Sequence, residues 1–346
     1  MKFLFKPISA PSAAFYQRAL DRQAQLTKPP GSLGLLESLA VRLAAMQGRD
    51  EPHLDNIHVS IFAADHGIAA EGVSAFPQAV TAEMVKNFAS GGAAVNVLAR
   101  YAKAHFEVVD VGLLQAINSS GVIAHRVAAG TENFKLKPAM TLAQLEEAMA
   151  AGESAINRAL ANAADIFIGG EMGIANTTSA SAIASALLAV PASDITGAGT
   201  GLNAEQIAHK ARIIDQALQR HQPALTKPLT ILQHLGGFEI AALSGAYIAA
   251  ARQGLPVLVD GFISTVAALS AANINPGCQE WFFYGHRSEE KGHKIVLKAL
   301  AAEPILNLGM RLGEASGAVL ALPILQMACR LHNEMATFTQ AQITTG

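Results

Sequence analysis

Cysteine is scarce in this chain, which has only two cysteines among its 346 residues. Cys278 and Cys329 are too few and too far apart for a disulfide framework or for a cage of thiolate metal ligands. Both lie in apolar stretches, which is typical of buried free thiols. The scarcity of cysteine therefore fits the reducing cytoplasm.

An excess of charge of one sign and long apolar runs are also lacking. The formal net charge is −2, and lysine and arginine are dispersed, so the chain offers no broad basic surface to a nucleic acid. The opening "MKFLFKPISAPS" has too short an apolar core for a secretory signal, and no apolar run reaches membrane-spanning length. We expect a cytoplasmic protein that acts on small molecules, without nucleic-acid or membrane partners.

What the chain does contain is ample material for a core. Apolar residues make up 51% of the sequence and charged residues 15%. A chain of this length and composition forms one compact unit, or a large domain with a smaller appendage.

Short apolar segments alternate with alanine-rich segments through the middle of the chain. The expected strands are residues 57–65, 105–112, 165–171, 229–237, 256–262 and 280–286. The expected helices are residues 81–100, 141–163, 203–221 and 238–254. This alternation predicts an α/β fold with a mainly parallel sheet and helices on both faces, a Rossmann-like three-layer arrangement. Ligands bind at the carboxyl ends of the strands in such sheets.

The two ends of the chain differ from the middle. Residues 12–47 resemble two helices joined by "TKPPGSLG", and residues 313–332 resemble another helix, with one possible strand at 304–306. We expect a small helical domain built from residues 1–50 and 306–346, packed beside the carboxyl edge of an α/β domain of residues 55–305. The seam between the two would be a cleft.

The segment "GGEMGIANTTSASAI" follows an expected strand and begins a helix. Gly173 permits close backbone approach, and Asn176, Thr177 and Thr178 bring polar groups to a helix N-terminus, which is a favourable place for a phosphate. An ordinary helix cap after a glycine-rich strand exit explains the same residues. The lysine that ends a P-loop is absent.

A second glycine turn occurs in "TGAGTGLNAEQIAHKARII". Gly199, Thr200 and Gly201 form the turn, and Lys210 follows about two turns into the next helix. Two such turns and a lysine suggest one phosphate held from two sides, whereas a lone lysine is usually a solvated surface charge.

Three histidines invite a metal hypothesis. His66 follows an expected strand, but no second histidine lies at ligand spacing, and His286 and His293 belong to "GHRSEEKGH", a charged loop that enters a helix. We expect no metal. A serine nucleophile is also unsupported, because the sequence has no Gly-x-Ser-x-Gly elbow.

Asp260 in "LVDGFIS" lies at the end of another expected strand. It orients either a ribose hydroxyl or a helix terminus.

One carboxylate, Glu314, lies between glycines in the apolar run "NLGMRLGEASGAVLALP". An acidic residue suits the first turn of a helix, where unpaired N–H groups attract negative charge. A cleft that desolvates Glu314 would instead raise its pKa and make it a general base.

Taken together, these segments resemble the nicotinate-nucleotide–dimethylbenzimidazole phosphoribosyltransferase family. The resemblance covers about residues 26–320 in the family's order. It runs through "LTKPPGSLGLLE", "FAADHGIAAEGVSAFPQAVT", "GGEMGIANTTSASAI", "GAGTGL", "HKARII", "LQHLGGFEIAALSGA", "LVDGFIS", "GHRSEEKGH" and "LGMRLGEASGA".

The resemblance implies a homodimer that transfers a phosphoribosyl group from nicotinate mononucleotide to 5,6-dimethylbenzimidazole in cobalamin biosynthesis, without a cofactor. It implies that Glu314 is the general base and that Glu171 and Lys210 lie around the nucleotide. The substrate-binding residues expected with them are Gly173, Asn176, Thr177, Thr178, Gly199, Thr200, Gly201, Asp260, Ser74 and Phe76.

Two residues depart from the family pattern. Ala175 and Ala315 stand where the resemblance leads us to expect glycine, so their methyl groups would trim the pockets and leave the base preference open. Transfer to adenine or another base is one alternative, and a nucleotide-binding protein without turnover is another.

Overall fold

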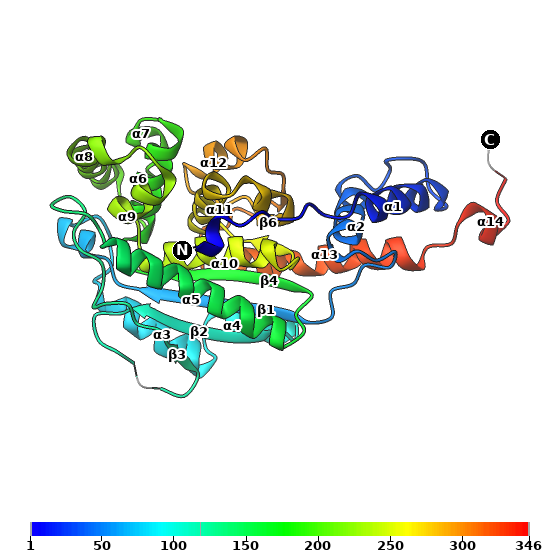
Figure 1. Ribbon diagram of the computed structural model, residues 1–346, viewed down its shortest axis with the longest axis horizontal. Helices are drawn as coiled ribbons and strands as arrows, with labels where there is room; N and C mark the ends of the chain where they lie inside the picture. Colours follow the sequence, from blue (N-terminus) through cyan, green and yellow to red (C-terminus); the bar gives the residue numbers. More distant parts are fainter. Residues whose placement is uncertain (1, 118, 345–346) are drawn as a thin grey trace.

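The computed structural model describes residues 2–117 and 119–344, and its centre is one parallel sheet (Figure 1). Within these residues the sheet has seven strands in the order β3-β2-β1-β4-β5-β6-β7, and every neighbouring pair is parallel. The strands are β1 (Ile57–Ala64), β2 (His105–Gly112), β3 (Val122–Ala124), β4 (Ile166–Met172), β5 (Val257–Val259), β6 (Phe282–His286) and β7 (Pro304–Leu306). The predicted α/β fold is confirmed.

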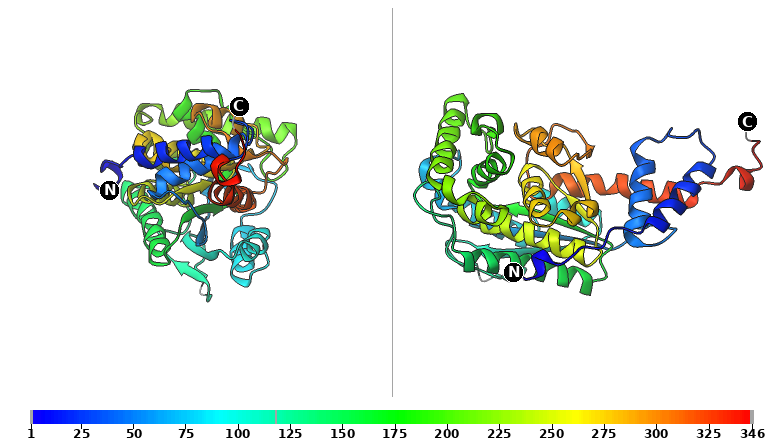
Figure 2. Two further views of the ribbon diagram at one scale, coloured as in Figure 1. Left: turned by 90° about the vertical axis from the view of Figure 1, so that its right-hand side faces the viewer. Right: turned by 45° about the horizontal axis from the view of Figure 1, so that its top comes forward.

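Helices cover both faces of the sheet. One face is covered by α5 (Leu142–Ala161), α10 (Phe238–Arg252) and α11 (Phe262–Ile274), and the other by α3 (Ala79–Ser90), α4 (Ala94–Tyr101) and α13 (Ser316–Glu334) (Figure 2). Because both faces are covered, every residue of β1 and β4 is buried. Helices α5 and α10 approach closely since Gly152 and Gly245 leave no side chain between their backbones.

The remaining helices lie around the edges. They are α1 (Ala13–Gln25), α2 (Leu35–Gln47), α6 (Asn176–Leu188), α7 (Ala192–Ile195), α8 (Ala204–His221), α9 (Pro228–Leu235), α12 (His293–Ala299) and α14 (Phe338–Ala341). Short 3-10 helices span Lys2–Phe5, Gly67–Glu71, Gln222–Ala224 and Pro276–Trp281. No helix among the described residues has the length and apolar character needed to cross a bilayer.

Two element predictions were wrong. The strand expected at 229–237 is replaced by helix α9 (Pro228–Leu235), because Pro228 suits a first helical turn and Ile231, Leu232 and Leu235 bury one helical face. The single helix expected at 81–100 is divided into α3 and α4, since Gly91 ends α3 in a left-handed conformation. The short edge strand β3 was not predicted.

The two ends of the chain pack together, as expected for residues 12–47 and 313–332. The guanidinium of Arg22 in α1 donates to the carbonyl oxygens of His332 and Asn333, at 2.6 and 2.7 Å. Helix α2 packs between α1 and α13 (Figure 1). Residues 1, 345 and 346 of the expected helical domain lie outside the described residues.

The expected position of these helices was wrong. Helices α1 and α2 lie at the amino ends of the strands, where Arg42 donates to Phe282 O at 2.7 Å and Gln326 to Leu54 O at 2.9 Å. Only the start of α13 reaches the carboxyl edge, beside Gly170. A 19-residue helix is about 28 Å long, so α13 crosses the sheet from one edge to the other.

Candidate active site

A cavity of about 630 Å³ lies at the carboxyl ends of β4 and β5. The strand order reverses between β1 and β4, and this switch point is where open parallel sheets bind ligands. The cavity wall comes from α3, α4, the starts of α6 and α11, and the loops at 199–200, 288–290 and 311–314. Its volume suits a substrate of nucleotide size.

Most of the predicted site residues line this cavity, although they come from distant parts of the sequence. The lining includes Phe76, Glu171, Gly173, Asn176, Thr177, Gly199, Thr200, Asp260 and Glu314. The other predicted residues lie behind the wall or beside it, and they are Ser74, Thr178, Gly201 and Lys210. Ser74 Oγ lies 3.3 Å from Thr200 Oγ1, so it links the loop before α3 to the second glycine turn.

Glu314 reaches the cavity through an unusual backbone turn. Gly313, Glu314 and Ala315 have consecutive φ angles of 83°, 61° and 63°, all in the left-handed region. Two of the three are not glycine, so the turn stores strain of about 1 kcal/mol or more per residue. The backbone N–H of Glu314 donates to Glu171 Oε1 at 3.4 Å, which keeps the turn against the end of β4.

The side chain of Glu314 does not cap helix α13. The residue at the cap position is Ala315, and the N–H of Ala318 donates instead to Asp260 Oδ1 at 2.8 Å. Asp260 therefore occupies the helix N-terminus that was one alternative for Glu314. Asp260 therefore has one of the two roles predicted for it, at a helix terminus, and it also lines the cavity.

Three carboxyl groups gather at the cavity. Glu314 is 8% exposed, and burial followed by the charge of Asp260 raises its pKa to about 7. Burial also raises the pKa of Glu171 well above its ordinary value, with a further contribution from Glu239, while a hydrogen bond from Asn176 opposes the rise. Such a cluster favours a ligand that carries positive charge or delivers a proton.

A buried lysine lies at the start of α6, beside the same cavity. Lys210 is completely buried, and its Nζ donates to Thr177 Oγ1 at 2.7 Å, a neutral hydroxyl rather than a carboxylate. Burial lowers the pKa of Lys210 to about 8, and the carboxylate of Glu290 opposes this shift. Gly199 approaches the lysine closely, and a Cβ atom at this position would lie 3.3 Å from Lys210 Nζ. A helix N-terminus and a buried ammonium together attract a phosphate.

Arg311 was missed by the sequence analysis. Its guanidinium lines the cavity and donates to Gly199 O at 3.2 Å, so it joins the loop of Glu314 to the second glycine turn. The signal in the sequence was an arginine three residues before Glu314 in an otherwise apolar run.

His66 forms a buried hydrogen-bonded group next to the site. Its Nε2 lies 2.7 Å from Glu239 Oε1 and its Nδ1 3.0 Å from Ser179 Oγ. A side chain at Gly173 would lie 3.1 Å from the His66 ring, so the histidine supports the turn between β4 and α6. Glu239 was missed, although it follows the two glycines of "LQHLGGFE".

Ala175 and Ala315 do not have the effect expected of them. Neither lines the cavity, and both are buried helix-cap residues with φ angles of 78° and 63°. The methyl group of Ala315 points at Gly170 in β4, where a side chain would approach it to 2.8 Å. The two methyl groups therefore affect backbone strain and packing rather than the pocket.

Comparison with known proteins agrees with this geometry. Residues 8–343 match the family model described as Phosphoribosyltransferase. The chain belongs to this phosphoribosyltransferase family. It is therefore an enzyme, as predicted, and the alternative of a binding protein without turnover is wrong.

Two relatives are named nicotinate-nucleotide–dimethylbenzimidazole phosphoribosyltransferase. Those of Ectopseudomonas mendocina and Pseudomonas fluorescens are 56% and 55% identical to this chain, and the matches cover 94% and 97% of it and 93% and 96% of the relatives. A crystal structure of the enzyme of that type from Thermus thermophilus aligns with a TM-score of 0.92 and 42% identity. The alignment covers 97% of this chain and all of that one.

The raised pKa of Glu314 predicts a pH dependence of stability. The carboxyl titrates near its ordinary value of 4.5 when unfolded but near 7 when folded. Between these values only the folded protein holds the proton, so the contribution of Glu314 to the free energy of unfolding falls as pH rises. Glutamine does not titrate, so Glu314→Gln removes this loss. We expect the free energy of unfolding of the variant, relative to wild type, to be about 2 kcal/mol greater at pH 8 than at pH 5.

Urea unfolding at the two pH values measures this difference. Glu303→Gln is the matched control, because Glu303 is exposed and its substitution should change stability equally at both pH values. If the free energy of unfolding of Glu314→Gln relative to wild type does not increase with pH, the raised pKa is contradicted.

Proposed function

We propose that the enzyme transfers the phosphoribosyl group of nicotinate mononucleotide to 5,6-dimethylbenzimidazole in cobalamin biosynthesis, forming α-ribazole 5′-phosphate and nicotinate. The observation that carries the proposal is Glu314, one carboxylate with a pKa near 7 that lines a nucleotide-sized cavity beside a buried lysine. The names of the relatives state the same pair of ring systems.

The carboxyl cluster suits the leaving group. The pyridinium ring of nicotinate mononucleotide is positively charged, and the carboxyl groups of Asp260 and Glu314 line the cavity, where their ionised forms provide the opposite charge. When the bond from C1′ to the pyridine nitrogen breaks, its electron pair returns to that nitrogen and the ring becomes neutral. A general acid is therefore unnecessary, unlike in the hydrolysis of glycosides.

The attacking group needs one general base from the protein. A nitrogen of 5,6-dimethylbenzimidazole forms the new bond to C1′, and the proton on its other nitrogen must leave. Glu314 accepts this proton, and a pKa near 7 matches the task, because about half of the groups are ionised at neutral pH and each carboxylate is a stronger base than an ordinary glutamate. Attack opposite the leaving group inverts C1′, so a β-nucleotide gives an α-product.

The phosphate gives the substrate its position. In this proposal its oxygens accept hydrogen bonds from Lys210, Thr177 and the N–H groups at the start of α6, with Arg311 nearby on the second glycine turn. A phosphate bound there would orient the ribose without taking part in the chemistry.

A direct assay tests the proposed function. Purified protein mixed with nicotinate mononucleotide and 5,6-dimethylbenzimidazole should release nicotinate and form an α-riboside phosphate, identified by chromatography and mass spectrometry. Omission of the base should stop the release. A panel that includes adenine determines which base is preferred, and failure to release nicotinate with every base would refute the proposal.

Glu314→Gln should remove the base while it keeps the shape of the side chain. We expect turnover to fall by roughly a hundredfold or more, whereas affinity for nicotinate mononucleotide is retained. The turnover of the wild type should rise with pH through about 7, as the carboxylate forms. Glu303→Gln should match the wild type, and near-normal turnover of Glu314→Gln would remove Glu314 from the mechanism.

Lys210→Met should weaken phosphate binding specifically. We expect the dissociation constant of nicotinate mononucleotide to rise roughly tenfold or more, with little change for the riboside that lacks the phosphate. Wild-type affinity for the nucleotide should fall above about pH 8, where Lys210 loses its charge. Lys294→Met, at an exposed lysine, is the control, and equal losses for nucleotide and riboside would contradict a phosphate contact.

We also propose a homodimer, with residues 55–305 as the substrate-binding domain and residues 1–50 and 306–346 as a small helical domain. Apolar side chains exposed at the cavity support a second copy, since Phe76 and Leu312 line the cavity and are 52% and 57% exposed. Sedimentation equilibrium should give twice the mass of the chain.

The buried free thiols of Cys278 and Cys329 support a cytoplasmic location.

A further inference from the structure

A second cluster of ligand-type side chains lies at the other end of the sheet from the active site. His58 in β1 and His105 in β2 are partners in the strand register, and Glu107 is two residues further along β2. Because side chains alternate along a strand, these three project from the same face of the sheet. One potential ligand atom from each lies within 4.8 Å of the other two.

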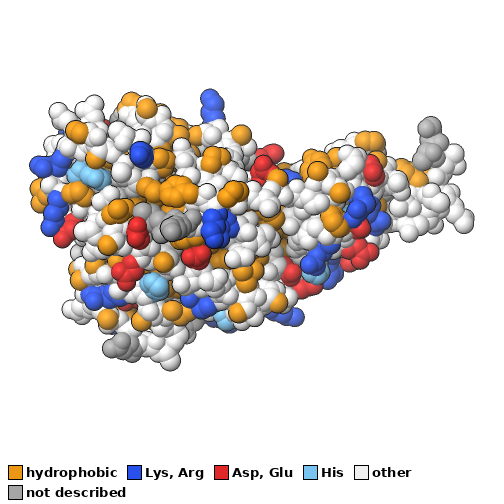
Figure 3. All heavy atoms as spheres, in the orientation of Figure 1, with side chains coloured by type: hydrophobic (Ala, Val, Ile, Leu, Met, Phe, Trp, Pro, Cys, Tyr) orange, Lys and Arg blue, Asp and Glu red, His pale blue; other side chains and the backbone are white. Residues whose placement is uncertain are grey.

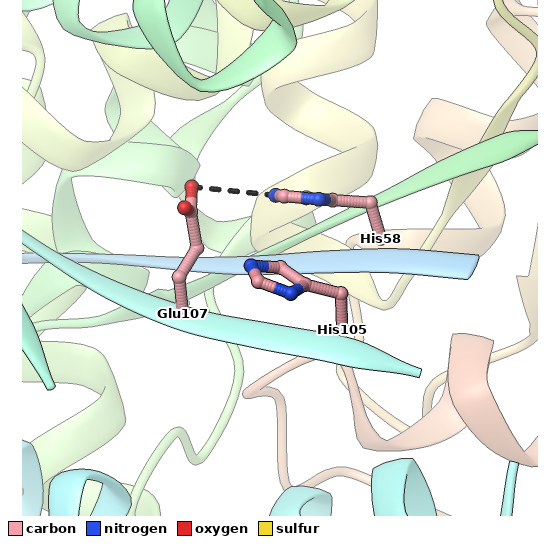
Figure 4. A group of neighbouring side chains, drawn as sticks. All are labelled: His58, His105 and Glu107. Carbon is pink, nitrogen blue, oxygen red and sulfur yellow. Dashed lines mark ion pairs between the residues drawn. The ribbon is translucent and has the colours of Figure 1, made fainter. Parts of the chain in front are cut away.

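The three side chains point toward one space. Figure 4 shows the two imidazole rings one above the other and the carboxylate of Glu107 beside their tips. The rings are stacked with their centroids 4.7 Å apart, and His58 Nε2 lies 3.5 Å from Glu107 Oε1. The contact between His58 and Glu107 is longer than an ordinary hydrogen bond, so it leaves both groups free to bind an ion.

His58 provides an independent sign of a missing partner. Its side chain is buried, and within the described part of the chain Nδ1 has no hydrogen-bond partner, while Nε2 has only the long contact of 3.5 Å with Glu107. A buried polar group without a partner is costly, and native proteins rarely leave one so. Coordination of Nε2 to an ion would satisfy this nitrogen.

The composition of the cluster identifies the class of ion. Two imidazoles and one carboxylate are a ligand set that proteins use for zinc, with water at the fourth position. His105 is exposed, and a cavity of about 430 Å³ lined by His105, Glu107 and Arg158 gives an ion and its water access from solvent. Nitrogen and oxygen ligands together also suit other divalent transition metals.

We propose that His58, His105 and Glu107 bind one divalent transition-metal ion of the zinc type, which ties β1 to β2 at the amino ends of the strands. No sequence pattern indicates this site, because the two histidines are separated by 46 residues and belong to no common motif. Only the register of the two strands brings them together.

Arg158 competes with the ion for Glu107. Its guanidinium donates to both carboxylate oxygens, at 2.9 and 2.8 Å, and Ser60 Oγ donates to Oε1 at 2.7 Å. The side chain of Arg158 is 32% exposed, so it can turn to solvent when an ion binds. The proposal therefore expects removal of the guanidinium to strengthen metal binding.

Calorimetric titration of the metal-free, full-length protein with Zn²⁺ tests the proposal. We expect one ion per chain, a rise in melting temperature with Zn²⁺, and visible absorption of a low-coordinate Co²⁺ complex when Co²⁺ replaces it. His105→Ala and His58→Ala should each weaken binding at least tenfold, whereas Arg158→Gln should strengthen it. Circular dichroism of each metal-free variant shows whether it is folded, and exposed His105 provides the variant least able to perturb the fold.

A neighbouring group supplies the control. His53, Asp55 and Asp165 form another set of possible ligands, so His53→Ala should leave the binding of the ion unchanged. Absence of binding, binding that His105→Ala does not weaken, or loss of binding in His53→Ala would each overturn the proposal.

Discussion

Removal of carboxyl groups from water at one edge of a parallel sheet is the constraint on which the candidate site depends. Burial alone makes Glu314 a stronger base than an exposed glutamate, and the neighbouring charge of Asp260 adds to the effect. The same burial keeps Lys210 away from solvent and lowers its pKa. The chemical character of the site therefore follows from what covers it more than from the residue types.

Helix α13 connects this edge to the rest of the molecule. Its first turn is held by Asp260 at the carboxyl ends of the strands, and its last turns pack with α1 and α2 at the amino ends. The strained turn at Gly313–Ala315 can persist because contacts at both ends of the helix fix its position. The terminal helices thus support Glu314 from a distance, although α1 and α2 do not line the cavity.

The two ends of the sheet hold different chemistry. Carboxylates and a lysine gather at the carboxyl ends, where turns begin helices and leave N–H groups for a ligand. At the amino ends, parallel register alone places His58 next to His105. A site of the first kind is expected for this fold class, whereas the second depends on which residues happen to be register partners.

The sequence by itself determined the fold class and most of the candidate site. Alternating apolar strands and helices predict the parallel sheet, and glycine turns after strands indicate where its ligand edge lies, because both signals are local. Tertiary structure decided what depends on contacts between distant residues. Residues 228–235 form α9 because one helical face packs inward. Arg311 and Glu239 joined the site through contacts with distant residues, and the length of α13 placed the terminal helices at the amino edge. The burial of side chains, the register of strands and the contacts between distant residues are properties of the folded chain, so no local sequence pattern encodes them.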